Sequence, residues 1–290
     1  MAAARGSLEP LGRLIAVDGR LMHIVSAGTK SMTEPTVLLE AGSFGFSADW
    51  SVVQEKLAAR GVHSVAYDRA GLGYSQPGPA PRDGLAIVSD LENLLIAARE
   101  DGPFILVGHS MAGLHVYLFA GRNPGKVAGV VLVDAVTPTA SDHPLARRMA
   151  AQYGRMSRLA ARAASLGLLK PFGALGDRIG LTARATPHKR WAFAHGPHSR
   201  VAADEVQQWE AAAQQARDAG PLNPDWPVAV VTAGPLSAAP HKTLQSEPAR
   251  LSRHGYNENV AAAGHASLLG VGHADAIVRA IEHVRGAAKG

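Results

Sequence analysis

The chain has 290 residues, of which 47% are hydrophobic, with no cysteine and a net charge of +5. This length and apolar content fit one large buried core and argue against a disordered or fibrous chain. The lack of cysteine excludes disulfide scaffolds, thiol nucleophiles and cysteine metal sites. Without an apolar run of about 18 residues or a secretory signal, the protein is expected to be cytoplasmic and to have no membrane span.

Strand and helix patterns alternate over the first half of the chain. RLIAV and LMHIVSAG predict a hairpin that turns at Asp18-Gly19. Short β-branched runs and helical periodicities then follow one another. The predicted strands are TVLLEAG, HSVAYD, FILVGHS and VAGVVLVD, and the predicted helices between them are DWSVVQEKLAARG, GLAIVSDLENLLIAARE and MAGLHVYLFAGRN. This order predicts an α/β fold with a mostly parallel, doubly wound sheet.

The alternation stops after Asp134 and resumes only at PVAVVTAG, residues 227–234. The stretch between them has helical periodicity. Its two clearest helices are PLARRMAAQYGRMSRLAARAASLG and DEVQQWEAAAQQARDAG. We therefore predict a helical cap, residues 138–222, inserted into a core made of residues 1–137 and 223–290.

The basic excess of the chain lies in this cap. It holds 12 Lys and Arg against 6 Asp and Glu, whereas the rest of the chain holds 17 against 18. On the first cap helix one face is apolar and another gathers arginines. The apolar residues are Leu145, Met149, Met156, Leu159 and Ala163, and the arginines are Arg148, Arg155, Arg158 and Arg162. We interpret this as an amphipathic helix with a solvated basic face. The alternative is a positive rim that attracts acidic substrates or an anionic surface. No nucleic-acid motif accompanies it, so nucleic acid is not an expected partner.

The stretch FILVGHSMAG, residues 104–113, ends an apolar run on a serine between small residues. A serine at a sharp strand-to-helix turn needs neighbours with small side chains, and Gly108, Ala112 and Gly113 meet that need. The turn places Ser110 at the start of a helix, where backbone donors favour developing negative charge. We predict Ser110 to be a nucleophile; the alternative is a buried serine at a strand end.

The chain resembles the α/β-hydrolase superfamily, and within it the capped serine hydrolases. The resemblance covers nearly the whole chain outside the cap and is carried by LLEAGSFGFSADW, YDRAGLGYSQP, VGHSMAG, VAGVVLVDA and AGHASLL. Ala112 stands where the family's G-x-S-x-G motif usually has its second glycine. The family takes its base from a histidine after the last strand, which implies His265 as the base here. His273 is then a surface or helix-capping residue.

The acid of the triad is less clearly marked. Many family members carry it after the strand that matches VAVVTAG, but no carboxylate follows there until Glu247. Some related families, including haloalkane dehalogenases, carry it one strand earlier, and the resemblance then implies Asp134. A carboxylate at either strand end can orient the imidazole. Asp134 is the predicted acid and Glu247 the reserve, with a purely local backbone role as the alternative for Asp134.

The oxyanion hole is expected to consist of two backbone amides. The resemblance implies Met111, which follows the nucleophile, and Ser43, in the loop after TVLLE. Family members usually have His-Gly in that loop, whereas this chain has Ala41-Gly42. Phe44 and His109 are the candidates for substrate contact, with packing as the alternative for each.

Two further motifs are weak. DRAGLGYS lacks the third glycine and the ribose-binding acid of a dinucleotide site. HGPHS places His195 and His198 three residues apart without further ligands at zinc-site spacing. No metal and no cofactor are expected.

The resemblance implies a carboxylesterase-like serine hydrolase that cleaves a small ester through an acyl-enzyme. Lactonase, amidase, carbon–carbon hydrolase and perhydrolase reactions use the same machinery and stay open. A serine nucleophile argues against haloalkane dehalogenase and epoxide hydrolase activity. A small-molecule receptor or sensor with slow or no turnover is the alternative from another class. The sequence indicates no oligomeric state.

Overall fold

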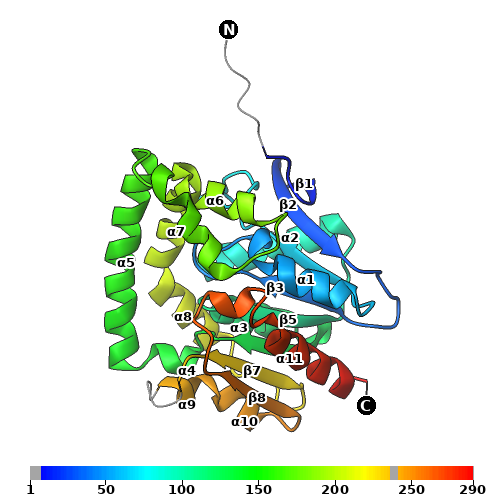
Figure 1. Ribbon diagram of the computed structural model, residues 1–290. Coiled ribbons are helices and arrows are strands. Elements are labelled where there is room, and N and C mark those ends of the chain that lie inside the picture. The colour runs from blue at the N-terminus through cyan, green and yellow to red at the C-terminus, as the bar shows by residue number, and fades with distance from the viewer. Residues whose placement is uncertain (1–7, 236–240, 290) are drawn as a thin grey trace.

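The chain folds into one eight-stranded sheet with helices on both faces (Figure 1). The computed structural model describes residues 8–235 and 241–289. The strand order is β1-β2-β4-β3-β5-β6-β7-β8. From β4 to β8 all neighbours pair in parallel, and only the pairs β1–β2 and β2–β4 are antiparallel. The strands are β1 (Arg13–Val17), β2 (Arg20–Ala27), β3 (Thr36–Glu40), β4 (Ser64–Tyr67), β5 (Phe104–His109), β6 (Val127–Val133), β7 (Val228–Ala233) and β8 (Gly255–Val260). The predicted mostly parallel α/β sheet is confirmed.

The sequence of the strands accounts for their positions. The central strand β5, FILVGH, is buried at every residue, as a parallel strand covered on both faces must be. The predicted hairpin joins β1 to β2, and both turn residues, Asp18 and Gly19, have positive φ of 49° and 78°. This is the backbone conformation that a tight two-residue hairpin turn requires.

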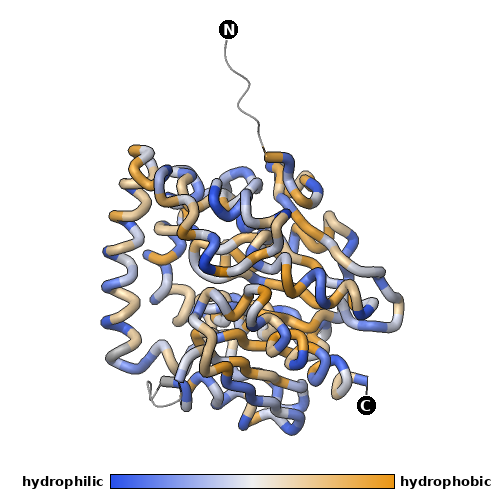
Figure 2. Tube along the Cα trace, in the orientation of Figure 1, coloured by the Kyte–Doolittle hydropathy of each residue, from blue (hydrophilic) through white to orange (hydrophobic). Residues whose placement is uncertain are grey.

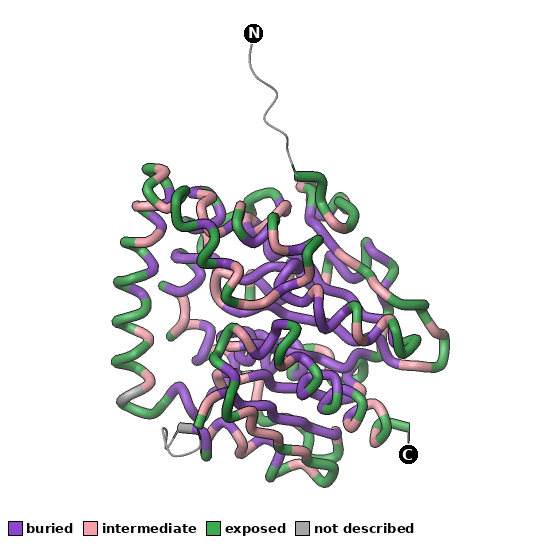
Figure 3. Tube along the Cα trace, viewed as in Figure 1, coloured by how far each residue is buried: buried purple, intermediate pink, exposed green. Residues whose placement is uncertain are grey.

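Two apolar layers enclose the sheet. On one face α1 (Ser51–Ala58) and α11 (Ala274–Ala287) pack over the strands. On the other face lie α2 (Gly84–Ala98), α3 (Ala112–Arg122) and α8 (Trp209–Asp218). Figure 3 shows the central strands, β3 to β7, almost entirely purple, so the core lies within and beside the middle of the sheet. The short elements η1 (Ser47–Trp50), η2 (Pro124–Lys126), α9 (His241–Gln245), α10 (Glu247–Leu251) and η5 (Ser267–Leu269) form connections between these elements.

Between β6 and β7 the chain is helical, and we call residues 138–222 the helical insertion. Its elements are α4 (Pro138–Ser141), α5 (Pro144–Ser165), η3 (Lys170–Ile179), α6 (Thr186–Ala194), α7 (Gly196–Gln207) and α8. The predicted domain boundaries stay predictions. The single helix expected over residues 204–220 is wrong, since it is divided at Gln208 between α7 and α8. The two parts pack on different neighbours, α8 on the core and α7 on α5, which one straight helix could not do.

The packing face of α5 differs from the expected one. The face buried against α7 consists of small residues, among them Gly154, Ser157, Ala161 and Ala164. Met149 and Met156 are 56% and 59% exposed, so the large apolar residues of α5 do not form its packing face. Small residues let the two helices approach closely, which leaves the large side chains at the flank. The side chain of Leu145 lies outside the described part of the structure.

Among the described residues, no helix is both long enough and apolar enough to cross a membrane.

Candidate active site

Ser110 lies between the end of β5 and the start of α3, at a sharp turn. Its φ of 58° is in the left-handed region, which is strained for a residue with a side chain. Three backbone hydrogen bonds hold it there. The Ser110 amide donates to the Val133 carbonyl at 3.1 Å, and the Ser110 carbonyl accepts from Gly113 at 3.1 Å and from Val136 at 2.9 Å. The turn therefore has support from both β6 and α3.

The small residues around the serine leave no room for larger ones. A Cβ at Gly108 would lie 2.7 Å from Val116 Cγ2, and one at Gly113 would lie 2.2 Å from the Val136 carbonyl oxygen. On the other side, a Cβ at Gly42 would lie 2.8 Å from Ser110 Cβ. The chain after β3 therefore passes directly against the serine. Ala112 is fully buried at the position where the motif usually has glycine.

A continuous line of hydrogen bonds runs from Ser110 to Asp134. Ser110 Oγ lies 3.0 Å from His265 Nε2, and His265 Nδ1 lies 2.6 Å from Asp134 Oδ2. The other carboxylate oxygen of Asp134 accepts from the Ala233 amide at 3.3 Å. The three side chains come from the ends of β5 and β6 and from the loop after β8. The carboxyl ends of parallel strands meet at one edge of the sheet, where sites of α/β proteins form.

Asp134 is held as an ionised carboxylate. Burial by itself would raise the pKa of Asp134, but the hydrogen bond and charge of His265, together with the Ala233 amide, lower it below its usual value. An ionised Asp134 accepts the Nδ1 proton of His265, which leaves Nε2 free to accept the proton of Ser110. His265 is half-exposed, so the pair is open to a ligand.

The alternative candidates lie elsewhere. Within the described ranges, Glu247 forms no hydrogen bond with His265; it starts the short helix α10. His273 is the residue before α11, but its side chain makes no capping hydrogen bond.

His109 braces the loop that carries His265. Its side chain is 7% exposed, its Nε2 lies 3.1 Å from the His265 carbonyl oxygen, and the two rings are 4.6 Å apart. Burial, aided by the nearby His265, lowers the pKa of His109 to about 3. The ring is therefore neutral and donates to the carbonyl. This geometry fits the packing alternative for His109, and substrate contact by it stays a prediction.

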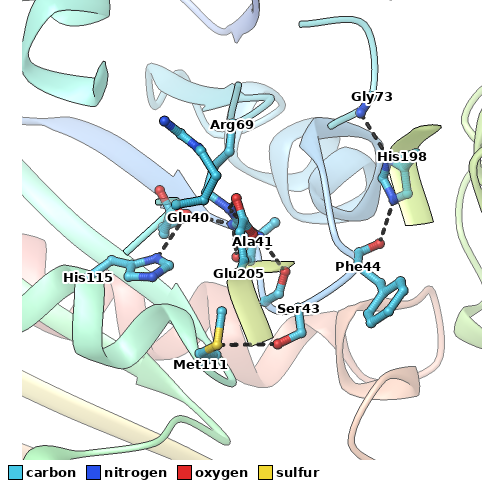
Figure 4. Close-up of polar contacts among 12 residues, drawn as sticks. Glu40, Ala41, Ser43, Phe44, Arg69, Gly73, Met111, His115, His198 and Glu205 are labelled. Atoms are coloured by element: carbon cyan, nitrogen blue, oxygen red, sulfur yellow. Dashed lines mark hydrogen bonds and ion pairs between the residues drawn. The ribbon is translucent and has the colours of Figure 1, made fainter. Parts of the chain in front are cut away.

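Ser43 and Met111 lie side by side next to Ser110. The Ser43 hydroxyl donates to the thioether of Met111 at 3.6 Å (Figure 4). Neither main-chain amide donates a hydrogen bond to the described part of the chain. Phe44, the next residue, has a φ of 58°, and its ring lies 6.5 Å from that of Tyr153 on α5. Two unused donors thus border the serine, and an aromatic pair borders the helical insertion.

Two side chains of the helical insertion fix the carbonyl of Phe44. Lys189 on α6 donates to it at 3.2 Å and also to Asp49 at 2.8 Å. His198 on α7 donates to it from Nε2 at 3.3 Å, while its Nδ1 accepts from the Gly73 amide at 3.0 Å (Figure 4). Burial, with the charge of Lys189, lowers the pKa of His198 to about 3. His198 is therefore a neutral bridge between two loops of the core.

A buried ion pair fixes the same loop at Ala41 and Gly42, which precede Phe44 in the chain. Arg69 donates from Nε to the carboxylate of Glu205 on α7 at 3.0 Å and from Nη1 to the carboxylate of Glu40 at 2.7 Å. The same guanidinium donates to the carbonyls of Ala41 and Gly42 (Figure 4). Burial alone would lower the pKa of Arg69, but Glu205 and Glu40 raise it, so the cation persists. We call residues 41–46 the bracing loop, since α6 and α7 hold it through Lys189, His198 and Glu205.

Sequence reasoning missed these bracing residues. The motif DRAGLGYS contains Arg69 and HGPHS contains His198, but neither motif tells which distant carbonyl its side chain meets. The signal in the sequence was that each motif carries two charged or titratable residues among small ones: Asp68 and Arg69 in the first motif, His195 and His198 in the second.

A family model described as the alpha/beta hydrolase fold matches residues 35–270. Among curated relatives, a pyrethroid hydrolase from Sphingobium wenxiniae is 34% identical over 112 residues, which cover 36% of this chain and 37% of the relative. The YqjL protein of Bacillus subtilis is 32% identical over 119 residues, covering 41% of this chain and 46% of the relative. In each case less than half of the relative's length is matched.

Solved structures match over nearly the whole chain. An enol-lactonase from Burkholderia xenovorans superposes with a TM-score of 0.66 at 18% identity, covering 93% of this chain and 98% of that one. At this identity the likeness shows the shared fold alone.

Proposed function

Because the chain belongs to the alpha/beta hydrolase fold family, we propose that it is a serine hydrolase that cleaves a carboxylic ester. The observation that carries this proposal is the line of hydrogen bonds from Ser110 through His265 to Asp134. In this proposal Ser110 is the nucleophile, His265 the base and Asp134 the acid that orients it. The names of the enol-lactonase and of the pyrethroid hydrolase are in keeping with hydrolytic chemistry.

The proposed reaction has two steps. His265 Nε2 takes the proton of Ser110 as Oγ forms a bond to the ester carbonyl carbon; the alcohol then leaves with that proton. Water next loses a proton to His265 and attacks the acyl-enzyme, and Ser110 recovers its proton as the carboxylic acid departs. Asp134 stabilises the imidazolium that forms in each step. The proposed reaction uses no metal and no cofactor.

The two free amides complete the proposed site. Negative charge develops on the carbonyl oxygen in both steps, and the amides of Ser43 and Met111 are the proposed donors to it. This assignment is supported because both amides lie beside Ser110 and donate no hydrogen bond to the described part of the chain. In the proposed cap, residues 138–222, Tyr153 faces Phe44, so this aromatic pair is a candidate wall for a small ester. The cytoplasmic location expected from the sequence is part of this proposal.

The first experiment is fluorophosphonate labelling followed by peptide mass spectrometry. We expect the label on Ser110, and its loss in Ser110→Ala and in His265→Ala. Absence of label on the folded protein, or label elsewhere, would contradict the assignment. The matched control is His273→Ala, which we expect to label like the parent protein.

Turnover of p-nitrophenyl acetate then separates an enzyme from a receptor. An enzyme releases many equivalents of p-nitrophenol per protein, and Ser110→Ala lowers the rate by about 10³ or more. If protein that reacts with the fluorophosphonate releases only one equivalent of p-nitrophenol, the slow-turnover receptor is favoured instead.

A further inference from the structure

The outer part of the helical insertion exposes an unusual share of large apolar side chains. Of the sixteen such side chains exposed in the described part of the chain, eight lie between residues 149 and 175. They are Met149, Tyr153, Met156, Leu159, Leu166, Leu168, Phe172 and Leu175, exposed by 38% to 76%. We call α5 and η3, residues 144–179, the apolar rim. Figure 1 shows α5 standing along one side of the molecule, away from the sheet.

These side chains are not needed for the packing of α5. Its contact with α7 is made through Gly154, Ser157, Ala161 and Ala164, which are buried. Figure 3 shows most of α5 in green, and Figure 2 shows hydrophobic and hydrophilic residues alternating along it. Clusters of exposed large apolar side chains beside polar residues mark surfaces that bind a protein or a membrane.

The charge of the apolar rim is almost entirely of one sign. Residues 143–176 contain five arginines and one lysine and no Asp or Glu. The acidic residue of the rim, Asp177, forms an ion pair with Arg190 on α6. Arg148, Arg155 and Arg162 form no ion pair or hydrogen bond with the described part of the chain. They directly precede Met149, Met156 and Ala163 and recur every seven residues along α5. The cations on and just after α1 are instead paired with carboxylates of α11, as in Lys56–Asp275 and Arg60–Glu282.

We propose that the apolar rim docks on a membrane surface rich in anionic lipids. An amphipathic helix that lies in a membrane interface combines large apolar side chains with Arg or Lys, and an anionic headgroup layer complements unpaired arginines. A second copy of this chain fits less well. A two-fold contact would set the cations of one rim against those of the other, and like charges repel across an interface.

The position of the rim gives such docking a consequence. Tyr153 belongs to the rim on α5, and its ring lies 6.5 Å from Phe44 of the bracing loop, next to Ser110. A docked lipid surface would therefore lie beside the proposed site. The docking itself does not depend on the proposed function, because it requires no chemistry at Ser110.

The test is co-sedimentation of the full chain with vesicles. We expect binding to vesicles of phosphatidylcholine mixed with phosphatidylglycerol, little binding to phosphatidylcholine alone, and weakening by salt. Arg155→Gln with Arg162→Gln should weaken binding about twenty-fivefold, since each arginine contributes about fivefold near an anionic surface. Met156→Ser with Leu159→Ser should weaken it by at least tenfold. The matched control is Leu251→Ser, an equally exposed leucine on α10.

Several results would overturn the proposal: no vesicle binding by the parent protein, equal binding to both kinds of vesicle, or equal loss in the control variant. A concentration-dependent dimer in light scattering that is abolished by Met156→Ser with Leu159→Ser, without vesicle binding, would assign the rim to a second copy. Ser110→Ala should bind vesicles like the parent protein. A protein that fails as a hydrolase but still binds is thereby distinguished from one in which the docking fails.

Discussion

At the scale of single residues, the site rests on a few side chains whose positions could be predicted to different degrees. Ser110 could be placed because a turn this tight restricts its neighbours to small residues, and that restriction is visible in the sequence. The acid could not be placed with the same ease, because strand ends carry many carboxylates and only the fold decides which one meets the imidazole. The structure brings Asp134 within 2.6 Å of His265.

Replacement of Asp134 tests the acid. Asp134→Asn removes the acceptor of the Nδ1 proton while keeping the shape, so the imidazole loses its orientation and its counter-charge. We expect kcat for p-nitrophenyl acetate to fall by about 10⁴, as in serine-protease triads. Glu247→Gln is the control and should leave the rate unchanged. A fall of less than tenfold in Asp134→Asn would move the acid elsewhere.

The buried histidines predict a loss of stability in acid. In the folded protein His109 and His198 have a pKa of about 3, whereas the usual pKa of a histidine, as in the unfolded chain, is 6.5. The unfolded chain therefore binds more protons between pH 6.5 and pH 3, so stability is fully present above pH 6.5 and falls as the pH drops through this window. The slope is at most about 1.4 kcal/mol per pH unit for each histidine.

Urea unfolding at several pH values measures this slope. His198→Gln removes one of the two groups, so the dependence on pH below 6.5 should become shallower. The matched control is His254→Gln, since His254 is exposed. If both variants keep the slope of the parent protein, His198 does not carry the effect.

At the scale of elements, the strands were more predictable than the helical insertion. Strands β3 to β7 are continuous apolar runs, and burial on both faces leaves them no other location. For α5, the amphipathic pattern did not reveal the packing face, because the small residues Gly154, Ser157, Ala161 and Ala164 make the contact with α7. The bracing contacts were also beyond prediction. Arg69 and Glu205 are separated by 136 residues, and no local pattern joins them.

Glu205→Gln tests the bracing of the loop by α7. The change leaves a buried guanidinium with Glu40 as its one remaining carboxylate, and loss of one partner in a buried ion pair is strongly destabilising. We expect a loss of about 3 kcal/mol in the free energy of unfolding, together with slower labelling of Ser110.

The control for this change is Asp204→Asn on the same helix, whose side chain is exposed. It should alter stability by no more than about 0.5 kcal/mol. Equal effects of the two changes, or an unchanged labelling rate in Glu205→Gln, would argue against a role of the ion pair in holding the bracing loop.

At the scale of the whole molecule, stability is distributed unevenly. The sheet is buried between two layers, whereas α5 has a single large contact, with α7. Local opening costs least where few apolar contacts are lost. The overall layout was predictable because alternating strands and helices allow few topologies. The local stability of each element could not be predicted, since it depends on what that element packs against.

Amide hydrogen exchange tests this gradient. We expect amides of α5 to exchange faster than those of α7, and those of β5 to be the slowest of the three. Ala161→Gly, at the α5–α7 contact, should speed exchange in α5 and leave β5 unchanged. Uniform protection of α5 and β5 would show that the insertion opens only with the whole protein.

The spacing of the three side chains along the chain has a consequence for the protein during its own synthesis. His265 follows Ser110 by 155 residues, and Asp134 comes between them. At about 5–20 residues per second, a ribosome needs about 10–30 s to add those residues. Throughout that time Ser110 exists without its proposed base, and the helical insertion is made before His265. If Ser110 is the nucleophile that we propose, a nascent or truncated chain carries it in an inactive form, and the proposed chemistry begins only once the last strand has joined the sheet.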